Sequence, residues 1–90
     1  MVKGIRLLEQ QLKAISNARR LAILRFLKKN KTATVQDIGK AVRLKSPALS
    51  QHLRILRSAG IVEYKRRGIF VTYRLSLKQE DPVKNVLSLL

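Results

Sequence analysis

Hydrophobic positions are most regular between Lys45 and Gly60, where the sequence reads KSPALSQHLRILRSAG. Leu49, Leu53 and Leu56 recur at steps of four and three residues, so a helix would place all three on one face. This stretch is therefore predicted to form a helix with an apolar stripe, and the other elements are interpreted around it.

Both ends of this helix, predicted over residues 46–59, carry sequence markers. Ser46 can cap its start, because a serine hydroxyl accepts hydrogen bonds from the free amides of the first turn. Pro47 fits the first helical position, where a backbone N–H is not needed. Gly60 can adopt the left-handed conformation that often closes a helix.

The opposite face of the same helix is small, polar or cationic, and it has no acidic residue. Small side chains allow a close approach to the DNA major groove, where hydroxyl, amide and guanidinium groups can bond to base edges or phosphates. The alternative is an ordinary surface helix with a solvated polar face. The candidate DNA-contacting residues are Lys45, Ser46, Ala48, Ser50, Gln51 and Arg54.

A shorter helix, predicted over residues 35–42, precedes this one. Thr34 can cap it, and Gly39 in its interior leaves room for a second helix to cross closely. Two short helices separated by a three- or four-residue turn form a helix-turn-helix, here expected over residues 35–59. Further upstream, residues 18–29 are apolar around most of the helix circumference and should form the central buried helix.

Amphipathic helices are predicted near both ends of the sequence, over residues 3–15 and 82–90. The last helix is short and must pack on another element to be stable. We expect the two helices to meet at a homodimer interface. The alternative for the first helix is packing on its own domain only. The expected interface residues are Ile5, Leu8, Leu12, Val83, Val86, Leu87 and Leu90.

After Gly60 the hydrophobic period changes from 3.6 to 2, which predicts strands over residues 61–66 and 69–76. Gly68 can adopt the positive φ of a short hairpin loop. Lys65, Arg66 and Arg67 would then lie at the tip of a two-stranded wing that contacts the DNA backbone or minor groove. A solubilising turn is the alternative. The positions expected on one face of the second strand are Ile69, Val71, Tyr73 and Leu75.

Charge favours a polyanionic partner. The 90 residues contain 20 Lys and Arg against 5 Asp and Glu, a formal net charge of +15. Such an excess favours nucleic acid or an anionic membrane surface. No apolar run approaches the ~20 residues of a membrane span, and no signal peptide is apparent. We therefore expect one cytoplasmic, nucleoid-associated domain over residues 1–90.

The sequence contains few of the residue types that catalytic or metal-binding sites use. The sequence has no cysteine, and His52 is its single histidine. There is no phosphate-binding glycine loop, and Glu80 and Asp81 are interpreted as the start of a helix. We expect no enzyme activity, no cofactor and no metal. An RNA-binding role is disfavoured because the sequence has few aromatic side chains that could stack on bases.

Four motifs in this order resemble the ArsR/SmtB type of winged-helix repressor. They are AISNARRLAILRFL at 14–27, DIGKAV at 37–42, SPALSQHLRILRSAGIV at 46–62 and RRGIFVTYRL at 66–75. The resemblance covers about residues 5–76. It implies a mainly α winged helix-turn-helix fold with a β-hairpin. It also implies a homodimer joined through the first and last helices, and repression by blocking a promoter.

The sequence departs from this family at the sensing positions. The helix over residues 35–42 lacks the cysteine pair of many metal-sensing members, and the last helix lacks their His and acidic ligands. The SPALSQHL run is similar to the non-metal-sensing, HlyU-like branch. Arg43 stands where the family's turn often has glycine. If this position is left-handed, Arg43 is strained by about 1 kcal/mol; the alternative is a turn that differs from the family's.

These observations predict a sequence-specific, dimeric repressor that binds double-stranded DNA. The helix over 46–59 would enter the major groove, and the wing over 65–69 would contact the backbone or minor groove. An architectural protein that binds DNA with little sequence preference is the alternative, because the net charge exceeds what a specific repressor needs.

Overall fold

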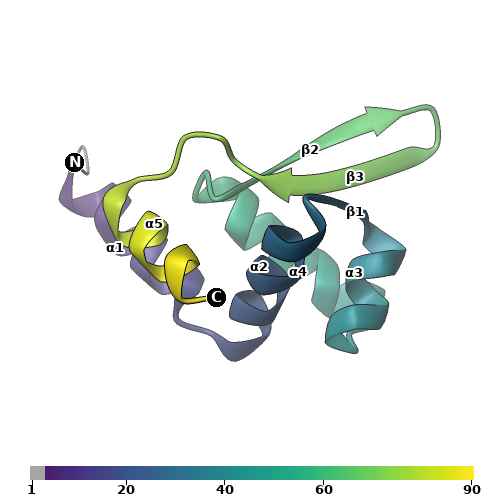
Figure 1. Ribbon diagram of the computed structural model, residues 1–90, viewed down its shortest axis with the longest axis horizontal. Coiled ribbons are helices and arrows are strands. Elements are labelled where there is room, and N and C mark those ends of the chain that lie inside the picture. Colours follow the sequence, from purple (N-terminus) through teal and green to yellow (C-terminus); the bar gives the residue numbers. More distant parts are fainter. Residues whose placement is uncertain (1–3) are drawn as a thin grey trace.

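The computed structural model describes residues 4–90. Helices form one body, and a β-hairpin projects from it (Figure 1). The predicted order of four helices, hairpin and last helix is confirmed, and the fold is a winged helix-turn-helix. Residue 3, the expected start of the first helix, lies outside the described residues. The elements are α1 (Ile5–Ile15), α2 (Ala18–Asn30), β1 (Thr32–Thr34), α3 (Val35–Val42), α4 (Ser46–Ser58), β2 (Val62–Arg67), β3 (Phe70–Leu75) and α5 (Asp81–Leu89).

Side-chain caps fix the starts of α2 and α3. Asn17 Oδ1 accepts from the Arg20 amide at 3.1 Å, and Thr34 Oγ1 accepts from the Asp37 amide at 3.1 Å. Each bond satisfies one amide that has no partner within its helix. The predicted Thr34 cap is therefore confirmed, and it sets where the helix-turn-helix begins.

The prediction that Ser46 caps α4 is wrong. Lys45 is the N-cap residue, with extended backbone angles and no side-chain bond, and Ser46 is the first helical residue. Pro47 still lies in the first turn, because proline is tolerated wherever the amide has no helical partner. The C-terminal end is confirmed, since Gly60 has φ +75° directly after the C-cap residue Ala59.

A third strand, β1, was not predicted. It pairs antiparallel with β3, with Ala33 opposite Tyr73, so the sheet order is β1-β3-β2. Three residues are too few to show an alternating pattern, and β1 is held by its pairing with β3 instead. Its effect is to anchor the base of the hairpin beside α3.

The hairpin turn also differs from the prediction. Arg67 pairs with Phe70, so the turn consists of Gly68 and Ile69 alone, and Arg66 and Arg67 belong to β2. Gly68 has φ +60° at the first turn position, as a type II′ turn requires. Ile69 is therefore in the turn and not on the inner face of a strand.

The core is built around α2, α3 and α4, as the hydrophobic pattern predicted. The leucine stripe of α4 packs onto α2, and the start of the hairpin closes one end. Close packing of this kind fixes how the helices cross, because interiors tolerate few voids. The fully buried side chains include Ile23, Leu24, Leu27, Ile38, Leu49, Leu53, Leu56, Ile61, Val62 and Val83.

Arg43 sits in the left-handed region, with φ 56° and ψ 48°, at the turn between α3 and α4. A side chain there is strained, whereas glycine is not. We expect Arg43→Gly to raise the free energy of unfolding by about 0.5–1 kcal/mol in urea titrations, with an unchanged m-value. Arg43→Ala keeps the Cβ and should bring no such gain. A less stable Arg43→Gly protein would contradict this interpretation of the turn.

Candidate nucleic-acid interface

The candidate residues of α4 lie on one exposed surface. The apolar stripe of the helix is buried, and this leaves the small, polar and cationic side chains in solvent. No acidic residue occurs in α4, so nothing on the helix itself repels a phosphate. We call this surface the α4 face. Its exposed members, together with the N-cap residue, are Lys45, Ser46, Ala48, Ser50, Gln51 and Arg54.

The angle between α3 and α4 depends on Gly39. A Cβ at this position would lie 3.0 Å from the Leu44 carbonyl oxygen and 3.3 Å from a methyl group of Leu49. The absence of a side chain therefore allows the turn and α4 to approach α3 closely, as the sequence predicted. Lys40, Arg43 and Lys45 border a groove of about 550 Å³ beside this turn. Lys40 and Arg43 were not among the predicted contacts, although cations beside a helix-turn-helix turn are candidates for phosphate contacts.

Helix α1 supports the far end of α4 through side-chain amides. Gln10 Nε2 donates to the Ser58 carbonyl at 3.2 Å, and Gln11 Nε2 donates to the Ala59 carbonyl at 3.1 Å. Gln11 is only 3% exposed. The last carbonyls of a helix lack intrahelical partners, so these bonds satisfy them and fix the position of α4. The sequence showed no sign of these contacts, which join residues 48 positions apart.

His52 points from α4 toward the start of α2. The Arg20 guanidinium lies 3.1 Å from His52 Nδ1, and it also donates to the Ala14 carbonyl at 2.6 Å. Because a guanidinium only donates, Nδ1 accepts and the ring proton of neutral His52 is on Nε2. Burial, then the charges of Arg20 and Arg19, lowers the pKa of His52. This histidine therefore joins α4 to the α1–α2 corner.

The lowered pKa gives a pH dependence of stability. Protonation is easier in the unfolded chain, where the histidine pKa is near 6.5, than in the folded protein. Protonation of His52 therefore does not reduce the free energy of unfolding above about pH 6.5. As the pH falls from 6.5 toward the lower pKa of the folded protein, the free energy of unfolding decreases. We expect the free energy of unfolding to decline in this window and the decline to be smaller in His52→Gln. An identical pH profile for the variant would contradict this role.

The wing is cationic along its outer half. Lys65, Arg66 and Arg67 are all exposed in β2. Glu63, the one acidic residue of the hairpin, forms a salt bridge with Arg74 on the neighbouring strand. That pairing neutralises the carboxylate at the base of the wing and leaves the positive charge toward the tip.

The wing is also fixed relative to α4. The guanidinium of Arg57 lies 4.7 Å from the centre of the Tyr64 ring, and the Tyr64 and Tyr73 rings are 5.8 Å apart. A cation over an aromatic face is attracted by the ring quadrupole. The two candidate DNA-contacting elements are therefore held together by packing as well as by the short connection between them.

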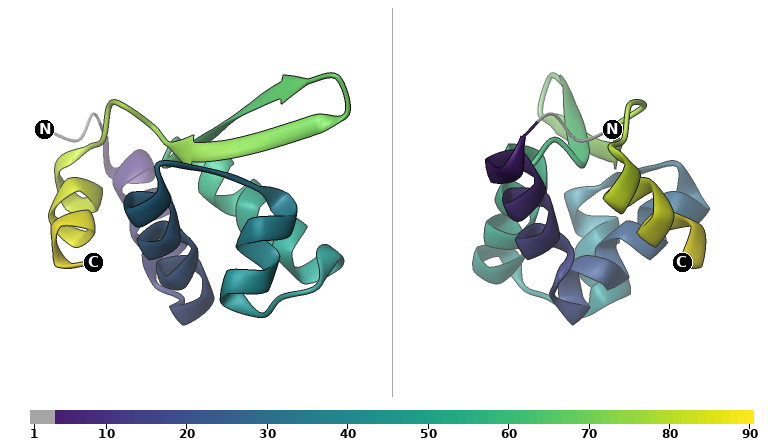
Figure 2. Two further views of the ribbon diagram at one scale, coloured as in Figure 1. Left: turned by 45° about the vertical axis from the view of Figure 1, so that its right-hand side comes forward. Right: turned by 90° about the vertical axis from the view of Figure 1, so that its left-hand side faces the viewer.

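The candidate dimer residues gather at the other end of the molecule. The right-hand view of Figure 2 shows α1 and α5 side by side at that end. Ile5 is 85% exposed and Leu12 is 46% exposed. Val83, in contrast, is fully buried within the protomer, so it has no surface left for a partner. The remaining candidates, which are half-buried, are Leu8, Val86, Leu87 and Leu90.

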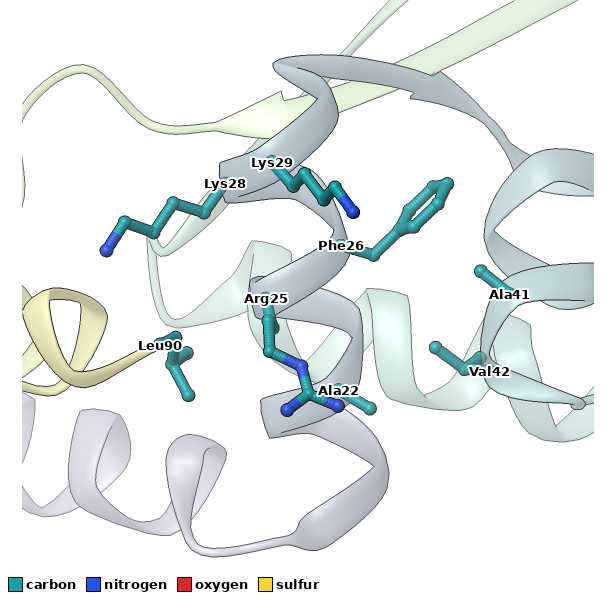
Figure 3. A pocket seen from close by; sticks show the side chains of 8 residues that line it. All are labelled: Ala22, Arg25, Phe26, Lys28, Lys29, Ala41, Val42 and Leu90. Atoms are coloured by element: carbon teal, nitrogen blue, oxygen red, sulfur yellow. The ribbon is translucent and has the colours of Figure 1, made fainter.

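A pocket of about 500 Å³ is lined by residues of α2 and α3 and by Leu90 after α5 (Figure 3). Three cations border it, but they point apart, with Lys28 toward α5, Lys29 toward α3 and Arg25 between them. Lys28 Nζ donates to the Leu87 carbonyl at 2.8 Å. These cations do not converge on one ligand group. The lysine bond instead holds the last turn of α5 against α2.

Residues 4–90 lack two other features that would suggest a different function. No three His, Cys, Asp or Glu side chains gather there as metal ligands would. In the same range, no helix combines the length and apolar character needed to cross a bilayer.

The fold and the α4 face define a class, the winged helix-turn-helix DNA-binding regulators of transcription. Residues 17–64 match the family described as "Bacterial regulatory protein, arsR family". The chain belongs to the ArsR family, and its likeness to HlyU places it in the HlyU-like branch.

Similar proteins support this assignment. The transcriptional activator HlyU of Vibrio cholerae is 39% identical over 79 residues, which are 88% of this chain and 69% of HlyU. The HlyU structure superposes with a TM-score of 0.80 at 35% identity, covering 99% of this chain and 92% of that one. The transcriptional repressor SdpR of Bacillus subtilis is 38% identical over 64 residues, 71% of this chain and 70% of SdpR. A homodimeric winged helix-turn-helix DNA-binding domain from Mycobacterium bovis has a TM-score of 0.79 at 29% identity, with 94% and 75% coverage.

Proposed function

We propose that this protein is a homodimeric repressor that binds a palindromic DNA site and blocks transcription there. The observation that carries the proposal is the exposed, acid-free α4 face, held by Arg57 and Tyr64 against a cationic wing. In a dimer joined through α1 and α5, two α4 helices would meet successive major grooves about 34 Å apart. Gln51 and Arg54 would contact base edges, and the wing cations would contact phosphates.

Repression itself is tested by transcription in vitro from a promoter that overlaps the bound site. We expect the protein to lower the transcript yield in proportion to occupancy of the site. SdpR is described as a repressor and HlyU as an activator, so the direction of the effect is informative. A rise in yield at the occupied promoter would contradict the proposal for repression and leave DNA binding intact.

The wing cations should act through charge alone. We expect Arg66→Ala and Arg67→Ala to weaken binding to all duplexes to the same degree. In the dimer, each substitution should also reduce the slope of log affinity against log salt by about two units, because each of the two wings neutralises one phosphate fewer. Lys29→Ala, which removes an exposed cation outside both elements, is the matched control. A change of sequence preference in Arg67→Ala would contradict the assignment to the backbone.

A second candidate function is general, architectural DNA binding. It is favoured by the net charge of +15 on each chain. Non-specific binding is mostly phosphate neutralisation, so a protein of this type would bind its best site and random DNA with similar affinities. Specific regulators typically differ by ~10³–10⁷ in the same comparison.

A further inference from the structure

Two large apolar side chains stand at the tip of the wing. Ile69 is 87% exposed and Phe70 is 65% exposed. They directly follow Gly68, and Phe70 is paired with Arg67 across the hairpin. Figures 1 and 2 show this tip projecting beyond the helical body.

Neither side chain has a role in the fold. Along β3, Tyr73 and Leu75 pack against the core, and Val71 shares their face by strand alternation. Phe70 lies on the opposite face of the ribbon, and Ile69 lies in the turn, where a small polar residue would serve the geometry equally well. Keeping both apolar groups in water is unfavourable, which points to a partner that covers them.

We infer that Ile69 and Phe70 form a wedge that enters the DNA minor groove and partly unstacks a base step at each end of the site. This inference rests on the proposed function. Apolar side chains used in this way kink DNA by roughly 20–90°. Lys65, Arg66 and Arg67 then hold the phosphates on either side of the inserted tip.

The position of the wing favours DNA as the partner that covers this tip. Arg57 of α4 stacks on Tyr64 of β2, which fixes the wing relative to the α4 face. A ligand that binds the α4 face is therefore expected to contact the wing as well. The residues next to the wedge are cations, and the Glu63 carboxylate is neutralised by Arg74. Double-stranded DNA fits this pattern, because its apolar, stacked base pairs lie between two negatively charged phosphate strands.

The wedge also gives specificity outside the α4 contacts. Pyrimidine–purine steps unstack most easily, so they require the least deformation energy. We therefore expect TA or CA steps to be selected at the two positions where the wings meet the duplex, although no side chain contacts a base edge there.

The test uses the full-length protein and its selected duplex, with 2-aminopurine at the flanking step and dyes at the two ends. On binding, we expect 2-aminopurine fluorescence to rise and energy transfer to report a bend. Ile69→Ser/Phe70→Ser should abolish both and weaken binding by at least roughly ten-fold, because apolar burial at the two wings no longer outweighs the cost of unstacking the base steps. Phe70→Leu should retain the bend. Leu77→Ser removes an equally exposed apolar residue outside the wing and should match the wild type.

The other outcomes of this experiment distinguish failure of the wedge from failure of the proposed function. A straight duplex with unchanged fluorescence, bound tightly by the wild type, would overturn the wedge but not the proposed function. A wild-type protein with no preferred duplex would overturn the proposed function itself. If the double serine variant bends DNA normally but loses binding to phosphatidylglycerol vesicles, the tip is a membrane contact and the wedge is wrong.

Discussion

Leu12→Lys is expected to give a folded monomer that binds the palindromic site ~10²–10⁴-fold more weakly than the wild type, because two linked half-sites are reduced to one. Leu12 is 46% exposed in the protomer, so the substitution leaves the core intact. A lysine in an apolar interface is unpaired and desolvated, which disfavours the dimer strongly. The added positive charge would by itself strengthen binding to DNA, so a loss of affinity cannot be an electrostatic effect.

Sedimentation and gel-shift titration measure the two parts of this prediction, and circular dichroism checks the fold. Asn30→Lys adds the same charge at the exposed end of α2, away from α1, and should remain a dimer with undiminished affinity. A Leu12→Lys protein that stays dimeric would place the interface elsewhere. A monomer with full affinity would show that dimerisation contributes nothing to binding.

Loss of Gln51 or Arg54 has the second large effect. Both are exposed on α4, so alanine at either position should leave the fold unchanged. Amide side chains pair with adenine and guanidinium groups with guanine in the major groove, at ~1–3 kcal/mol of discrimination for each bidentate contact. We expect each variant to lose that preference at one base pair of each half-site while binding to random DNA changes little.

Titration of the consensus duplex and its single-base variants measures the effect. Arg25→Ala, which removes an exposed cation from α2, provides the comparison for charge alone. If Arg54→Ala weakened consensus and random duplexes equally, its guanidinium would be a phosphate contact. The α4 face would then lack its expected guanine contact.

The two ends of the molecule are connected through α1. Gln10 and Gln11 bond to the last carbonyls of α4, while Leu12 on the same helix lies at the candidate interface. A dimer joined through α1, as proposed, would therefore bear on a helix that directly supports the α4 face. This arrangement gives a physical reason why a change at α1 or α5 could alter DNA binding without touching a DNA contact.

The sequence predicted the elements that depend on local chemistry and periodicity. The predictions of the Thr34 cap, of the glycine at position 60 and of the leucine stripe of α4 were each correct. Each of these features depends only on residues that are close together in the sequence. For Arg43 the sequence left two alternatives, a strained left-handed residue or a different turn, and its backbone angles are those of the first.

Features that depend on tertiary contacts could not be predicted in this way. Strand β1 is defined by its pairing with β3, some forty residues later. The bonds from Gln11 to Ala59 and from Arg20 to His52 likewise join distant segments. The hairpin turn was misplaced by one residue, because a run of cations followed by one glycine fits two registers equally well and only the pairing with β3 selects one.

Selection of binding sites from a random duplex library, repeated at two salt concentrations, distinguishes sequence-specific DNA binding from binding to the phosphate backbone alone. We expect a palindromic consensus with half-sites about one helical turn apart, bound at least ~10³-fold more tightly than random DNA at both concentrations. Enrichment of no sequence, with an affinity that collapses as salt rises, would contradict this expectation and show a protein that recognises the phosphate backbone alone.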